Sequence, residues 1–347
     1  MSLTLPLESA KFITDQAKHT KICSEGIDHL SKMVLSSLRD TSCNYFNFKS
    51  FELNPKEINE NSIHWIFIVD TLNFSFWSIP PKTEENKEDF QYKVNYKNKV
   101  YHGYWALCAA INRAIDEGYH MLDSKFYSSI SESDLKHIFR SSTTVEIPLF
   151  NERLQVLRET GRFLNDNFDG NFVNCIKVAN KSAKKLLEII VNNFRSYRDE
   201  ATYKDRKVTF YKRAQILVAD IWACFEGRGL GEFYDIDDIT MFADYRVPQV
   251  LRFFKCIDYS NELNDFLKKN ELLHTGDVFE VEIRAASILA CNLITQNVKK
   301  LSELESDGKK VHVNDILVDY FIWNYRRDYA EEIEAFLPCH KIRCIFY

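Results

Sequence analysis

The 347-residue sequence contains few of the residues that interrupt regular structure, with only ten glycines and seven prolines. This composition excludes a low-complexity or loop-dominated chain. The nine cysteines include no CxxC pair, which argues against a disulfide framework or a zinc site. No uncharged apolar run reaches the length that spans a bilayer, and the first residues lack the pattern of a signal peptide. We therefore expect reduced thiols and a cytoplasmic protein, also compatible with the nucleus, with no membrane association.

Motifs for cofactors and metals are also missing from the sequence. It contains no HExxH, no P-loop and no G-x-G-x-x-G loop after a strand, and its histidines are not spaced as metal ligands. Nothing indicates a local serine or cysteine triad. The formal net charge of −5 gives no general attraction for nucleic acid. We expect no metal, no cofactor and no stable nucleic-acid complex, and we expect a monomer, although the sequence does not fix the oligomeric state.

The residues that are present favour a mainly α-helical fold with a real core, because 45% are hydrophobic and 14% are aromatic. Apolar residues recur at three- and four-residue spacing over most of the chain. The spacing predicts helices over 27–38, 104–117, 133–139, 149–168, 172–194, 212–225, 249–254, 261–268, 278–301 and about 313–335. A small antiparallel β element is predicted near 63–102, with strands at 65–69, 92–96 and 99–102. We expect an N-terminal α+β part over 1–140 and a helical part over 141–347, packed as one unit.

One short segment combines an acid, two aromatic residues and a cation, namely Phe242, Asp244, Tyr245 and Arg246. Pro248 follows, and proline is tolerated in a first helical turn. If a helix begins near 247 or 248, its positive end favours an ionised carboxylate at Asp244. Such a carboxylate at a pocket wall could stabilise positive charge on a sugar. The sequence alone favours a simpler interpretation, in which Asp244 is only a helix cap.

Blocks spread over nearly the whole chain carry a more specific signal. They are DTLNFSFWS (70–78), YWALCAAINRA (104–114), FYKRAQILVAD (210–220), FADYR (242–246), EVEIR (280–284), DYFIW (319–323) and HKIRCIFY (340–347). In this order they resemble the queuosine salvage protein family, enzymes that hydrolyse queuosine 5′-phosphate and release queuine. The resemblance implies a helical architecture related to that of base-excising DNA glycosylases. Its implied catalytic residue is Asp244, which would stabilise an oxocarbenium-like state and direct water.

The resemblance also implies cationic substrate contacts. Lys212 would lie near the catalytic carboxylate or the substrate phosphate, for which lysine is a suitable point charge. The alternative is a solvated lysine at a helix start. Arg246 would contact phosphate or substrate, and the alternative is a structural salt bridge.

A third group of candidates lies on the last long helix. The resemblance points to Asp319 and Tyr320 as contacts for the modified base, whose guanine-like edge and amine suit an acid. Tyr320 and Asn324 are four residues apart and share a helix face, so a hydrogen bond from Asn324 is expected. The alternative places Tyr320 in the core and pairs Asp319 with a surface cation.

Aromatic side chains supply the last candidates. Phe242 and Tyr245 could stack on the base. Asn73, Phe74 and Trp77 form an aromatic turn that could line the base pocket or fill the junction between the two parts of the protein. Two further acids, Glu280 and Glu282, are expected to form ion pairs that orient Arg246 or Arg284.

The sequence therefore predicts an N-glycosyl hydrolase acting on a small nucleotide. Two alternatives stay open at this point. One is a non-catalytic helical module that binds a nucleoside or nucleic acid, and the other is a DNA glycosylase, which the acidic net charge opposes.

Overall fold

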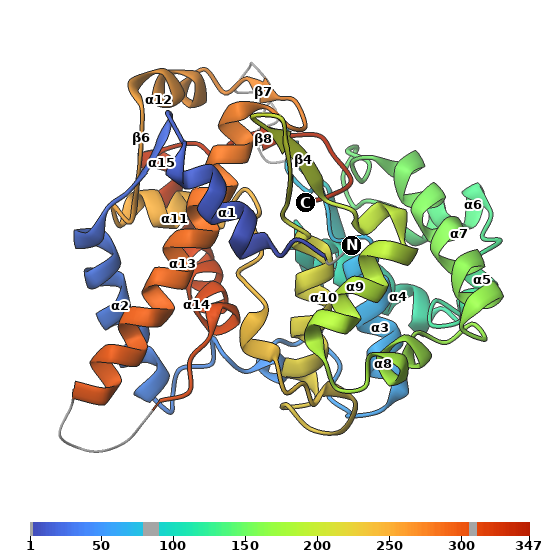
Figure 1. Ribbon diagram of the computed structural model, residues 1–347. Coiled ribbons are helices and arrows are strands. Elements are labelled where there is room, and N and C mark those ends of the chain that lie inside the picture. Colours follow the sequence, from blue (N-terminus) through green and yellow to red (C-terminus); the bar gives the residue numbers. More distant parts are fainter. Residues whose placement is uncertain (1–2, 79–89, 305–310) are drawn as a thin grey trace.

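The computed structural model describes residues 3–78, 90–304 and 311–347, which are mainly α-helical as predicted (Figure 1). The helices before residue 200 are α1 (Pro6–Asp15), α2 (Ser24–Arg39), α3 (Glu60–Thr71), α4 (Tyr104–Asp116), α5 (Ser124–Tyr127), α6 (Glu132–Ile138), α7 (Phe150–Asn167), α8 (Phe172–Ala179) and α9 (Ala183–Asn193). Those after it are α10 (Lys212–Cys224), α11 (Val247–Phe253), α12 (Asn261–Lys268), α13 (Val278–Leu304), α14 (Asp315–Asp328) and α15 (Ala330–Phe336). Within the described ranges, no helix has both the length and the apolar character to cross a membrane.

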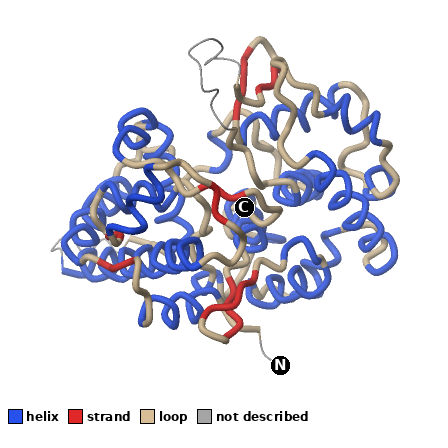
Figure 2. The backbone as a smooth tube through the Cα atoms, turned by 90° about the horizontal axis from the view of Figure 1, so that it is seen from above, coloured by secondary structure: helices blue, strands red, loops and turns tan. Residues whose placement is uncertain are grey.

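The strands are short and lie apart from one another, as Figure 2 shows. The antiparallel pairs in the described chain are β1 (Thr20–Ile22) with β6 (Ile257–Tyr259), β2 (Lys93–Tyr96) with β3 (Lys99–His102), and β4 (Glu200–Tyr203) with β5 (Arg206–Thr209). A parallel pair joins β7 (Leu272–Leu273) to β8 (Lys341–Ile342). The predicted N-terminal β element is confirmed at β2 and β3, and the β4–β5 hairpin was not predicted.

The predicted strand at 65–69 is wrong, because these residues belong to α3. Their run of apolar and β-branched side chains has no amphipathic period, since α3 is buried against α4, α7, α8 and α10. A helix that is covered on all sides gives the same sequence pattern as a buried strand. Asn59 starts α3, accepting a hydrogen bond from the backbone N–H of Ser62.

Two predicted long helices are each interrupted once. The 172–194 segment breaks at Asn180 and Lys181, which have left-handed φ values of 50° and 62°, and Ser182 then caps α9. The 313–335 segment breaks at Tyr329, between α14 and α15. Hydrophobic spacing continues across both breaks, so periodicity alone could not locate them.

Buried apolar side chains form two large clusters and a small third one. The first gathers around α3, α4, α8, α9 and α10, and the second around α13 with α1, α2, α11 and α14. Figure 1 shows the long α13 on one side and α10 near the middle. Both large clusters contain residues from before and after position 140. The predicted division of the chain into an N-terminal part over 1–140 and a helical part over 141–347 stays a prediction. The segment before α11 lies at the junction, because Phe242, Ala243 and Tyr245 belong to the first, second and third cluster respectively.

Candidate active site

A cavity of about 730 Å³ opens where these clusters meet. This volume lies within the usual range for small-molecule sites. Its walls come from the loop after α3, the start of α4, α10, the segment before α11, and α14. Among the predicted site residues, those lining it are Asn73, Trp77, Lys212, Phe242, Asp244, Tyr245, Arg246, Asp319, Tyr320 and Asn324.

Asp244 lies at the cavity wall and at the start of α11, so both interpretations of the sequence apply to it. Its Oδ1 accepts hydrogen bonds from the backbone N–H groups of Arg246 (2.8 Å) and Val247 (2.9 Å). These bonds cap the helix, whose first turn contains Pro248 as expected. Oδ2 takes part in none of the hydrogen bonds found within the described residues. One oxygen therefore fixes the carboxylate, which leaves the other available to a ligand.

Lys212 is buried, which overturns the alternative of a solvated lysine at a helix start. Its side chain is only 6% exposed, and its Nζ lies 3.4 Å from the carbonyl oxygen of Asn73. Burial lowers the pKa of this lysine, while the nearby carboxylates of Asp244 and Asp70 oppose the shift. Lys212 is thus a cation enclosed by acids.

Helix α14 brings its predicted residues to the same wall. The Oδ2 atom of Asp319 accepts a hydrogen bond from the backbone N–H of Phe242 at 3.2 Å, so it is not paired with a surface cation. Burial, and then Asp244, raise the pKa of Asp319. The rings of Phe242 and Tyr320 lie 6.2 Å apart. Asn324 donates to the carbonyl oxygen of Tyr320 at 2.8 Å.

Two acids next to the site were not proposed from the sequence. Asp220 lines the cavity and accepts a hydrogen bond from the Tyr320 hydroxyl at 2.8 Å, and burial raises its pKa to about 7. Asp70 is completely buried behind it, and one of its oxygens has no hydrogen-bond partner among the described residues. Burial and Asp220 raise the pKa of Asp70. Both acids lie in the family blocks, at the start of 70–78 and at the end of 210–220. The eight-residue spacing of Lys212 and Asp220 also puts both on one side of α10.

The aromatic turn after α3 divides between the two roles considered for it. Asn73 and Trp77 line the cavity, whereas Phe74 does not and is fully buried. The Phe74 ring packs against the guanidinium groups of Arg153 and Arg213, with centroid distances of 4.2 and 5.0 Å. Phe74 therefore fills the core behind the site.

Comparison with known proteins identifies the family. The family model described as queuosine salvage protein matches residues 53–347. The chain belongs to the queuosine salvage protein family. A relative from Nematostella vectensis is 44% identical over 99% of this chain and 98% of its own length, and one from Bos taurus is 42% identical over 99% of both. A bacterial relative from Sphaerobacter thermophilus is 38% identical over 85% and 84%. All three are named queuosine 5′-phosphate N-glycosylase/hydrolase.

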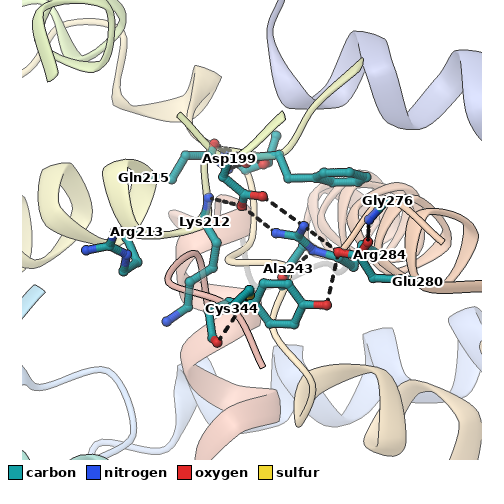
Figure 3. Close-up of polar contacts among 12 residues, drawn as sticks. Asp199, Lys212, Arg213, Gln215, Ala243, Gly276, Glu280, Arg284 and Cys344 are labelled. Atoms are coloured by element: carbon teal, nitrogen blue, oxygen red, sulfur yellow. Dashed lines mark hydrogen bonds and ion pairs between the residues drawn. The ribbon is translucent and has the colours of Figure 1, made fainter. Parts of the chain in front are cut away.

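An ionic network fixes the backbone next to the cavity (Figure 3). Arg284 is 2% exposed, and its two terminal nitrogens donate to both carboxylate oxygens of Asp199. Its Nε donates to the carbonyl oxygen of Ala243 at 2.9 Å, one residue before Asp244. The Oδ2 of Asp199 also accepts the backbone N–H of Lys212 at 3.0 Å. The network therefore ties the start of α10 to the segment that carries Asp244.

The predicted ion pairs of the two glutamates are confirmed in one case and wrong in the other. Glu280 accepts a hydrogen bond from Arg284 at 3.0 Å. Glu282 instead accepts hydrogen bonds from the backbone N–H groups of Lys18 and His19 and from the Tyr203 hydroxyl. Both backbone donors lie after the end of α1, too distant from Glu282 in sequence to be anticipated.

Proposed function

We propose that this protein hydrolyses the N-glycosidic bond of queuosine 5′-phosphate and releases queuine and ribose 5-phosphate. The names of its relatives supply the substrate class. The observation that carries the proposal is the arrangement of Asp244, whose carboxylate is held by one oxygen and lines a cavity of nucleotide size.

In the proposed reaction, the bond between C1′ of the ribose and the base nitrogen breaks, and its electron pair leaves with the base. The ribose then carries positive charge, which the Asp244 carboxylate stabilises electrostatically. Water adds to C1′ and gives one proton to Asp244. Fixing the carboxylate before reaction means that little reorganisation is needed as charge develops.

The leaving base needs a proton, and Asp220 is the group we assign to supply it. Its pKa of about 7 keeps the carboxyl group protonated below neutral pH, and the Tyr320 hydroxyl fixes its position. Asp319, Tyr320 and Asn324 hold the base edge, with Phe242 and Tyr245 against its faces. Two carboxyl groups in different environments thus take different roles.

The test is to incubate the purified protein with queuosine 5′-phosphate, without added metal, and to follow queuine by mass spectrometry. We expect release by the wild type and a loss of about 1,000-fold or more in Asp244→Asn. Asparagine keeps an oxygen that can cap α11, so the variant should retain its fold, which circular dichroism checks.

Other outcomes separate the alternatives. Binding of the substrate without release would favour a binding module. Tight, salt-sensitive binding of duplex DNA in a gel shift would favour a DNA glycosylase. Normal release by a folded Asp244→Asn protein would remove Asp244 from the mechanism.

A further inference from the structure

The charged side chains that line the cavity form two groups at different depths, because Asp319 is buried whereas Arg327, eight residues later on α14, is exposed. At the inner end, one buried cation, Lys212, faces the carboxyl groups of Asp220, Asp244 and Asp319, with Asp70 behind them. We call this the acidic end. A phosphate dianion placed here would be repelled by several carboxylates, while the charge of Lys212 already interacts with them.

The opposite end carries an excess of cations. Arg246 and Arg326 both bind the same Oε2 atom of Glu334, at 2.9 and 2.7 Å, so the group of three keeps a net positive charge. Lys341 is a further cation near this group, since it also affects the pKa of the neighbouring Cys339 thiol. Glu331 is the other carboxylate that lines this end.

Arg327 is the least satisfied cation at this end. Its guanidinium packs on the rings of Trp105 and Trp323, with centroid distances of 5.1 and 5.0 Å. It forms none of the hydrogen bonds or ion pairs found within the described ranges. The two rings hold the guanidinium in place, and its N–H groups are therefore available to a ligand. A guanidinium can bind phosphate in a bidentate manner.

His102 lies near the same cations. Partial burial, and then Arg327, Lys93 and Arg246, lower its pKa. The histidine thus stands among cations from β2, α14 and the Asp244 segment. We call Arg246, Arg326, Arg327 and His102 the basic end.

We propose that the basic end, with Arg327 as its principal contact, binds the phosphate of the substrate, and that Lys212 does not. This inference rests on the proposed function for the identity of the nucleotide. Asp244 links the two ends, because its carboxylate interacts electrostatically with both Lys212 and Arg246. In a nucleotide the base and the 5′-phosphate lie on opposite sides of C1′, so this order puts the scissile bond at Asp244.

The experiment measures binding of the two products separately by calorimetry, using ribose 5-phosphate and queuine as probes. Arg327→Gln should raise the Kd of ribose 5-phosphate about tenfold or more, because a charge-assisted contact is lost. Arg327→Lys should recover part of the affinity. Lys212→Met should change this Kd less than Arg327→Gln does.

Arg162→Gln is the matched control. Arg162 is an exposed arginine of α7 that does not line the cavity, and its loss should leave both Kd values unchanged. An increase in the Kd of ribose 5-phosphate that is specific to Arg327→Gln supports the basic end. An unchanged Kd in Arg327→Gln, or a larger increase in Lys212→Met, would overturn the proposal.

Failure of the proposed function gives a different result. If the wild-type protein binds ribose 5-phosphate through Arg327 but releases no queuine from queuosine 5′-phosphate, the proposed phosphate site stands and the proposed hydrolase activity is rejected. If queuine is released and the wild type and Arg327→Gln bind ribose 5-phosphate equally well, the proposed hydrolase activity stands and the proposed phosphate site is rejected.

Discussion

Two buried ionic groups lie next to each other in this protein, and they are built in opposite ways. Around Arg284, one guanidinium donates hydrogen bonds to two carboxylates and to a carbonyl oxygen. Around Lys212, one ammonium group interacts electrostatically with four acids, and an oxygen of Asp70 has no hydrogen-bond partner within the described chain. Asp199 links the groups, because it binds both Arg284 and the backbone N–H of Lys212.

We interpret the Arg284 group as a structural scaffold and the Lys212 group as the reactive site. A buried charge is tolerated when hydrogen bonds replace the water it has lost, and Arg284 meets that condition. Asp199 and the other partners more than offset the effect of burial and raise the pKa of Arg284. The Lys212 group does not meet the condition, so burial raises the pKa of Asp70, Asp220 and Asp319. An acid whose pKa is raised toward neutral pH can transfer protons at physiological pH.

The largest expected effect is a loss of stability when Arg284 is replaced. Arg284→Met leaves Asp199 and Glu280 buried without their cation, which should lower the free energy of unfolding by about 3–5 kcal/mol. Chemical denaturation measures this change. The double variant Arg284→Met with Asp199→Asn should recover part of the loss, because one uncompensated charge is removed. Equal stability of wild type and Arg284→Met would mean that the two groups do not differ as described.

Next in size is the removal of Lys212. Lys212→Met leaves the acids without the cation that lowers the pKa of Asp70, Asp220 and Asp319. We expect kcat for queuosine 5′-phosphate to fall about 100-fold, with a smaller loss of stability than in Arg284→Met. Lys212→Arg keeps the charge and should restore part of the rate. A fully active Lys212→Met protein would contradict the assignment of this group to chemistry.

The smallest effect concerns Asp220 and pH. Its pKa is about 7 in the folded protein, against about 3.9 in an unfolded chain. Between these values the folded state binds a proton that the unfolded state does not, so stability falls as pH rises. Asp220→Asn lacks this decline. Its Tm should exceed that of the wild type by about 2 °C or more at pH 8 and differ less at pH 5, as calorimetry can measure.

Activity gives a second check on Asp220. The wild-type kcat should decline above about pH 7 as the acid ionises, and Asp220→Asn should be slower and lack this decline. A variant with the wild-type pH profile would assign the proton donor elsewhere.

How much of the fold the sequence predicted depends on whether a helix has a polar face. Amphipathic helices such as α12 were located to the residue, because one face is apolar and Ser260 caps the start. The buried α3 was taken for a strand because it has no polar face. The start of α11 followed from Pro248.

The candidate site was predicted unevenly for a similar reason. Asp244, Lys212 and Asp319 were found through the family blocks, and the cavity brings them together. Asp70 and Phe74 occur in one such block, but only their packing shows that Asp70 lies behind Asp220 and that Phe74 faces two arginines. Contacts between residues far apart in sequence decide burial, and burial decides the pKa values that distinguish Asp220 from an ordinary surface acid.

The segment around Asp244, residues 242–246, has one more consequence. Three of its backbone groups are bound by different partners: the N–H of Phe242 by Asp319 of α14, the carbonyl of Ala243 by Arg284 of α13, and the N–H of Arg246 by Asp244 itself. The segment is thus ordered before any ligand arrives, and binding costs little conformational entropy there. A substitution in α13 that frees Ala243 would therefore weaken ligand binding through disorder, without removing a single ligand contact.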